Sequence, residues 1–166
     1  KVQCNTLKAL NVANNPLFYT TWLANFPNLL HLDLSRTRIS HFNALPVLCP
    51  SLISLDISAT RICSHVAFLN CVVGAFPKLN SLYISSRAGI LPLLELFSSS
   101  EVLQYIAHLI VTYDLPLRVI DGRLLSLEEI LHLADLASQT SFLQQGSILK
   151  HALSLEMTQF IRALDL

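Results

Sequence analysis

Residues 26–39 read FPNLLHLDLSRTRI, and residues 49–62 repeat the pattern as CPSLISLDISATRI. Counted from Leu29 or Leu52, apolar residues stand at the first, fourth, sixth and eleventh positions, and a threonine stands at the ninth. The same spacing begins at Leu7, with Asn at the ninth position. A weaker copy begins at Leu79, with apolar residues at the first, fourth and sixth positions and Arg at the ninth. The four starts are 22, 23 and 27 residues apart. One folding unit therefore recurs along the chain.

Alternation inside each unit predicts a short strand. Successive side chains of a strand point to opposite faces, so Leu32 and Leu34 face inward while Asp33 faces outward. The ninth position lies at the bend that follows, where an Asn side chain normally bonds nearby backbone groups. The hydroxyls of Thr37 and Thr60 are expected to do this more weakly. A single unit cannot close a core, so the units must stack.

This pattern resembles an intracellular leucine-rich-repeat array. The resemblance implies an α/β solenoid, with about 4–5 short parallel strands on its concave face, that ends in C-terminal helices. The array is expected to cover residues 1–125, with 117–120 as its last strand and Gly122 ending that strand. The return segments, such as residues 20–26 and 65–74, are expected to hold one or two helical turns.

The C-terminal residues 126–166 are interpreted as a helical cap or as the start of a helical, armadillo-like domain. Ser126-Leu127-Glu128-Glu129 is a capping box that predicts a helix to about Leu136, and a second helix is expected from Ser147. Upstream, the polar run 98–101 favours a helix over the apolar positions that follow. An alternative phasing places a strand at Ile106, Leu109 and Val111 instead.

The Ser-x-Thr-x-Ile endings of residues 26–39 and 49–62 also resemble the zyg-eleven and ZER-type proteins. Those are substrate receptors of cullin–RING ubiquitin ligases, built from leucine-rich repeats followed by an armadillo-like domain. The resemblance implies a scaffold or substrate-recognition module; the alternative is a structural subunit of a larger stable complex. Residues 44–53 match the loose elongin-binding box as well, but that box is a helix, which Pro46 and Pro50 oppose.

The candidate binding residues follow from the strand phase, because equivalent positions of stacked units form columns on the concave face. These side chains are small, polar and mildly acidic, which suits a peptide or a helix of another protein. Arginines at the strand exits form a basic rim. The columns are Ala9, His31, Ser54, Ser81; then Asn11, Asp33, Asp56, Tyr83; then Ala13, Ser35, Ser58, Ser85; the rim is Arg36, Arg38 and Arg61.

The motif content of the sequence favours a binding protein over an enzyme. The sequence holds no G-x-G-x-x-G, phosphate loop, H-E-x-x-H or G-x-S-x-G motif. Its six histidines are scattered, no cysteine pair has C-x-x-C spacing, and no metal or cofactor is expected. Asp33 and Asp56 are expected to lie on neighbouring strands of an open face, as binding residues and not as a catalytic acid pair. No small-molecule substrate is expected.

Composition and charge limit the classes of partner and the cellular compartment that are expected. Residues 1–90 carry seven Lys/Arg and two Asp/Glu, which gives +5, and residues 91–166 carry four and nine, which gives −5. Basic clusters with interleaved aromatic residues are lacking, which argues against nucleic acid. The longest near-apolar stretch, 66–76, is too short to span a bilayer. Four cysteines without paired spacing are interpreted as reduced thiols in a cytoplasmic or nuclear protein.

Overall fold

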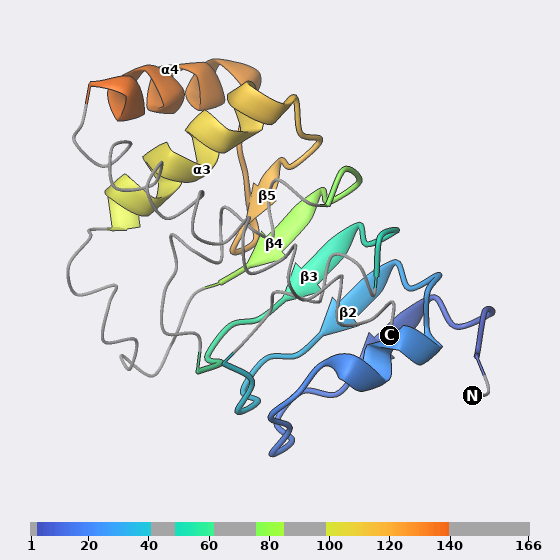
Figure 1. The fold of residues 1–166 in the computed structure, drawn as a ribbon. Helices are drawn as coiled ribbons and strands as arrows, with labels where there is room; N and C mark the ends of the chain where they lie inside the picture. The colour runs from blue at the N-terminus through green and yellow to red at the C-terminus, as the bar shows by residue number, and fades with distance from the viewer. Residues whose placement is uncertain (1–2, 41–48, 62–75, 85–98, 140–166) are drawn as a thin grey trace, which may run out of the picture.

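Among the residues that the computed structural model of the protein describes, one six-stranded, mostly parallel sheet carries two α-helices at one end (Figure 1). The structure describes residues 3–40, 49–61, 76–84 and 99–139. The strands follow one another across the sheet in chain order. They are β1 (Ala9–Asn11), β2 (His31–Asp33), β3 (Ser54–Asp56), β4 (Ser81–Tyr83), β5 (Val119–Ile120) and β6 (Arg123–Leu124).

The sequence repeat and the strand register coincide. Leu10, Leu32, Leu55 and Leu82 are paired across β1 to β4, so each strand begins at the same position of its unit. The strands are also joined by a repeated backbone pattern, in which two successive N–H groups donate to one carbonyl of the preceding unit. Leu30 and His31 donate to Lys8 O, and Ile53 and Ser54 donate to Leu30 O. The predicted parallel pairing of equivalent strand positions is confirmed for β1 to β4.

The hydrophobic core lies under one face of the sheet and is filled by the repeat positions. Leu29, Leu32, Leu34 and Ile39 are all buried, and the equivalent Leu52, Leu55 and Ile57 of the next unit are buried too. Full burial of one such aliphatic side chain stabilises the fold by about 1.5–3 kcal/mol. Burial of these equivalent leucines therefore contributes to the cohesion between units.

The bends after β1, β2 and β3 occupy equivalent positions of their units. Asn14, Arg36 and Ala59 have positive φ values of 59°, 56° and 54°, which turn the chain out of the strand. One residue later, Asn15 donates from Nδ2 to Val12 O at 3.0 Å. The buried hydroxyls of Thr37 and Thr60 donate to Leu34 O and Ile57 O, each at 2.8 Å. The expected role of the threonines at the bend is confirmed.

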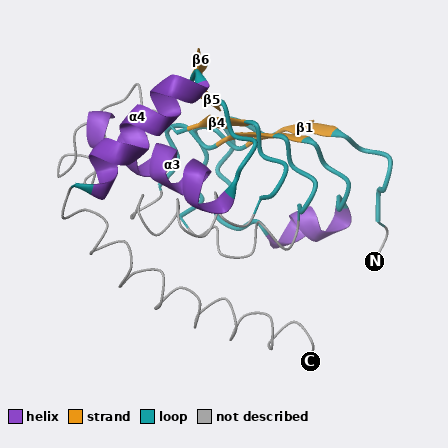
Figure 2. Ribbon diagram, turned by 90° about the horizontal axis from the view of Figure 1, so that it is seen from above, coloured by secondary structure: helices purple, strands orange, loops and turns teal. Residues whose placement is uncertain are grey.

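Helical elements lie away from the strands. A 3-10 helix, η1 (Thr21–Asn25), follows the first unit on the opposite side of the coil from β1, as Figure 2 shows. The helices α3 (Ser99–Tyr113) and α4 (Leu127–Ser138) pack against each other at the β5 end of the sheet. The return helix expected at 65–74 and the one expected from Ser147 lie outside the described residues. Neither α3 nor α4 is long and apolar enough to cross a bilayer.

Two sequence-based expectations need correction near the C-terminal end of the sheet. Residues 106–111 lie within α3, so the alternative strand phasing is wrong. The last parallel strand begins at Val119 and not at residue 117, and the sheet does not end there. Asp121 and Gly122 have φ values of 50° and 80°, as the two central residues of a type I′ hairpin require, and the chain returns as β6, antiparallel to β5. The Asp-Gly pair is a strong hairpin signal that the repeat-based interpretation overlooked.

Helix α4 confirms the predicted helix start, with Ser126 as its N-cap. The side chain of Ser126 accepts a hydrogen bond from Glu129 N at 3.2 Å, while Glu128 and Glu129 place negative charge in the first turn. Both effects stabilise a helix N-terminus, because the first backbone N–H groups have no partner within the helix. The helix runs two residues beyond the predicted end, to Ser138.

Candidate functional site

The predicted columns lie side by side on the sheet face opposite the core. Register pairs His31 with Ala9 and Ser54, and pairs Asp33 with Asn11 and Asp56. Ser81 and Tyr83 continue the two columns on β4. All of these side chains are exposed or half-buried, whereas the central residue of each of β2 to β4 is buried. We call the columns from Ala9 to Ser81 and from Asn11 to Tyr83, with Ala13, Ser35 and Ser58 just beyond them, the polar face; Ser85 lies outside the described residues.

Side chains at the ends of the strands are held by short hydrogen bonds. Asn11, Asp33 and Asp56 each accept, through Oδ1, from the backbone N–H two residues later, at 2.9 Å in every case. Asn11 Nδ2 also donates to Asp33 Oδ2 at 2.8 Å, which links β1 to β2. Such side-chain turns fix the rotamers of the carboxylates, so the two negative charges stand at defined positions on the face.

The carboxylates of Asp33 and Asp56 differ in how many oxygen atoms remain to accept a hydrogen bond from a ligand. Asp33 uses both oxygens, one on Ser35 N and the other on Asn11. Asp56 receives both of its bonds, from Ser58 N and Ser58 Oγ, on the single oxygen Oδ1. Within the described ranges, Oδ2 of Asp56 therefore retains its full capacity as an acceptor for a ligand N–H.

Tyr83 closes the middle column at its β4 end. A Cβ placed on Gly122 would lie 4.0 Å from Cε1 of this tyrosine, so the ring stands beside the β5–β6 turn. Neighbouring parallel strands lie about 4.8 Å apart, which brings the ring within reach of a group bound at Asp56. An aromatic ring next to a carboxylate suits a cationic or amide-bearing side chain of a peptide.

At the strand exits, one arginine of the basic rim contacts an aromatic side chain, which the sequence did not indicate. Arg36, Arg38 and Arg61 are all exposed, as expected. The guanidinium carbon of Arg38 lies 5.6 Å from the ring centroid of Phe18, a cation–π contact. Phe18 and the neighbouring Tyr19 were not among the predicted site residues, because they occupy a return segment for which the repeat pattern makes no prediction.

Two groups whose pKa values are shifted by burial lie away from the polar face. Burial raises the pKa of the Cys49 thiol to about 12, and burial also lowers the pKa of His108, but neither residue lies on this face. In the part of the chain that the structure describes, no three His, Cys, Asp or Glu side chains gather as a metal site would require. What the face offers is an ordered set of donors, acceptors and charges that can bind a partner.

No protein-family model matches this chain, and a search of curated proteins finds no similar sequence.

Proposed function

We propose that the chain is a leucine-rich-repeat solenoid that binds a segment of another protein on its polar face. The observation that carries this proposal is the register of β1 to β4, which stacks Asn11, Asp33, Asp56 and Tyr83 in one continuous column. An extended segment or a helix laid across the strands would meet each of these side chains in turn. The fold class supports binding by analogy, and the side chains supply the specific chemistry.

The charges of the face favour a segment with basic or amide side chains. Asp33 and Asp56 are prealigned by their bonds to Ser35 N and Ser58 N, so a bound Lys or Arg needs no rearrangement of either carboxylate. Prealigned groups lower the entropy cost of binding. On the resemblance of residues 26–39 and 49–62 to the zyg-eleven and ZER-type proteins, we propose that the bound segment is a substrate of a cullin–RING ubiquitin ligase in the cytoplasm or nucleus.

Peptide selection against the immobilised chain tests the binding role. Peptides that bind the wild-type chain are then measured by fluorescence polarisation against Asp33→Lys with Asp56→Lys. Each lost charged contact is worth about 1.5–3 kcal/mol, so affinity is expected to fall at least tenfold. A second variant, Asp33→Asn with Asp56→Asn, keeps the acceptor oxygens that bond Ser35 N and Ser58 N, and it is expected to weaken binding less while preserving the fold.

Glu128→Lys with Asp135→Lys on α4 is the matched control, because it makes the same change in charge on exposed residues of a different element. Peptide affinity is expected to stay at the wild-type value. Peptides that bind both aspartate variants as tightly as the wild-type chain would place the site away from the polar face and refute the proposal.

A further inference from the structure

Two exposed apolar patches of opposite charge lie at opposite ends of the protein, and we infer that one copy binds the other through them. The first is the aromatic rim, formed by Phe18, Tyr19, Arg38 and Arg61. The second is the acidic leucine face, formed by Leu124, Leu127, Glu128, Leu131 and Asp135. In this association the aromatic rim of one copy receives α4 of a second copy. The polar face takes no part in it.

The aromatic rim exposes rings on a backbone that is held in place. Tyr19 is 76% exposed and Phe18 is 48% exposed, which is unusual for two adjacent aromatic side chains. Their backbone is fixed on both sides, since Arg38 N donates to Leu17 O at 2.9 Å and Trp22 Nε1 donates to Tyr19 O at 2.7 Å. The rings are thus presented to solvent by ordered structure.

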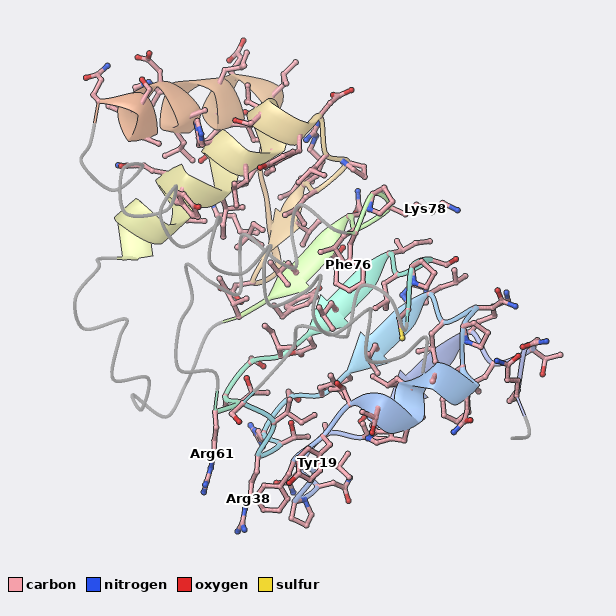
Figure 3. All side chains as sticks on the ribbon, viewed as in Figure 1. Tyr19, Arg38, Arg61, Phe76 and Lys78 are labelled. Atoms are coloured by element: carbon pink, nitrogen blue, oxygen red, sulfur yellow. The ribbon has the colours of Figure 1, made fainter. Side chains whose placement is uncertain are left out.

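Two arginines add positive charge to these rings. Arg38 and Arg61 occupy the same position of successive units, and the backbone N–H of each donates to the unit before it, to Leu17 O and Ile39 O. Figure 3 shows both side chains and Tyr19 pointing away from the sheet at one edge. The side chain of Lys78 points into solvent at a different place on the molecule, away from these three residues. The Arg38 guanidinium lies over Phe18, and its side chain is exposed. A guanidinium that stacks on a ring can still donate hydrogen bonds from its edge. Such a guanidinium is positioned to bind a carboxylate.

The acidic leucine face presents matching groups on α4 and the strand before it. Leu127 and Leu131 are one helical turn apart and are 62% and 51% exposed, and Leu124 of β6 is 72% exposed. At 3.6 residues per turn, Glu128 and Asp135 fall beside these leucines on the outward side of the helix, and both are exposed. The face is an apolar stripe bordered by carboxylates.

The two patches complement each other in both charge and polarity. Aromatic rings can cover the leucines while Arg38 meets Glu128 or Asp135, and Arg61 adds to the positive charge of the rim. Figures 1 and 3 place α4 at the opposite end of the protein from Arg38 and Arg61, so the two patches of one copy cannot meet each other. Charge over the whole sequence has the same polarity, with +5 in residues 1–90 and −5 in residues 91–166. A net charge of zero also removes the repulsion that keeps proteins apart.

Each copy carries both patches, so the contact is head-to-tail and leaves one patch open at each end of a dimer. Such heterologous contacts grow beyond dimers unless the rotation closes a ring. Small patches and exposed ion pairs give weak association, because surface pairs are worth only about 0.2–1 kcal/mol each. We expect reversible assembly in the range of roughly 10–500 µM.

Sedimentation velocity with charge-reversed variants of the full chain tests this association. The rim variant is Arg38→Glu with Arg61→Glu, and the helix variant is Glu128→Arg with Asp135→Arg. Each alone is expected to stay monomeric at concentrations where the wild-type chain assembles. An equimolar mixture is expected to assemble again, since the intact rim of one meets the intact helix of the other and the two reversed patches also match. A reductant prevents cross-links through the partly exposed Cys4.

Lys8→Glu with Lys78→Glu is the control, because it reverses two exposed charges of the same sign away from the rim and should leave assembly unchanged. Tyr19→Ala should weaken assembly at least threefold, and about 1 M salt should weaken it strongly, because the screening length falls to about 3 Å. A wild-type chain that stays monomeric across the range refutes the inference. So does a mixture that fails to assemble although both variants have the wild-type circular dichroism spectrum.

Discussion

The carboxylate of Asp121 accepts a hydrogen bond from the backbone N–H of Ile84 at 2.7 Å, in a place where every earlier unit uses a backbone carbonyl. Val12, Leu34 and Ile57 donate to Asp33 O, Asp56 O and Tyr83 O at 3.0, 2.8 and 2.9 Å. At Asp121 the chain turns into the β5–β6 hairpin, and the acceptor for the Ile84 N–H is the side chain instead of a backbone carbonyl. The side chain takes over the missing acceptor, and the ladder continues up to the hairpin.

Replacing Asp121 with Ala should therefore destabilise the sheet. Ile84 is buried, and a buried N–H without a partner costs about 1–3 kcal/mol. A further contribution of about 1 kcal/mol comes from the left-handed backbone at φ 50°, which Asp tolerates better than Ala. Urea unfolding followed by circular dichroism measures the total.

Two variants separate these contributions. Asp121→Asn keeps both an acceptor oxygen and the tolerance of a positive φ, so its loss of stability should be small. Asp114→Ala changes an exposed Asp that also has φ 50°, and it should show the backbone cost alone. Equal losses for Asp114→Ala and Asp121→Ala would mean that the bond to Ile84 adds nothing.

The buried hydroxyl of Thr60 is expected to stabilise the bend after β3. Thr60→Val keeps the shape but removes the donor to Ile57 O, and the free energy of unfolding should fall by about 1 kcal/mol. Thr60→Asn should lose less, because Asn15 at the equivalent position donates to two backbone carbonyls.

Thr21→Val is the control for Thr60, since Thr21 is an exposed residue of η1 and its replacement should change stability by less than about 0.5 kcal/mol. Urea denaturation of the three variants measures these changes in the free energy of unfolding. A Thr60→Val protein as stable as the wild-type chain would show that the backbone alone holds the bend.

Cys49 should resist alkylation in the native protein. Its side chain is fully buried, and burial raises the pKa of its thiol to about 12, so at pH 8 the reactive thiolate is almost absent. Cys4 is partly exposed, and a hydrogen bond with Thr6 lowers the pKa of its thiol. Timed labelling with iodoacetamide, followed by peptide mass spectrometry, should show Cys4 modified first and Cys49 modified only after denaturation. Equal rates at pH 8 would contradict this order.

Burial of His108 should make stability depend on pH. Burial lowers the pKa of His108 below its ordinary value of 6.5, so the unfolded chain binds its proton more readily than the folded one. Stability from this group is therefore fully present at pH values above 6.5 and declines as the pH falls below 6.5. Urea midpoints measured between about pH 7.5 and 5 should show the decline, and it should be smaller in His108→Gln. His132→Gln, which replaces an exposed histidine of α4, is the control.

Local sequence patterns predicted much of this structure because one pattern is repeated along the chain. The phase of Leu32 and Leu55 was sufficient to place Asp33 beside Asp56, since a two-residue period leaves only one assignment of inward and outward positions. The bend positions of Thr37 and Thr60 and the helix start at Ser126 followed in the same way, because they depend on hydrogen bonds over two or three residues.

Features that lie outside the repeat pattern were not predictable from it. Leu124 and Arg123 belong to β6, whose pairing with β5 depends on the Asp-Gly turn and not on the repeat. The contact between Phe18 and Arg38 joins two units, and no spacing rule links their side chains.

By itself, the sequence determined strands β1 to β4, their phase and the polar face, because alternating burial is a property of neighbouring residues. Only the tertiary structure decided that Asp121 serves Ile84, that Arg38 lies over Phe18, and that the leucines of α4 remain exposed. These outcomes depend on which segments of the chain meet in the folded protein, and the spacing of residues along the sequence does not predict which segments meet.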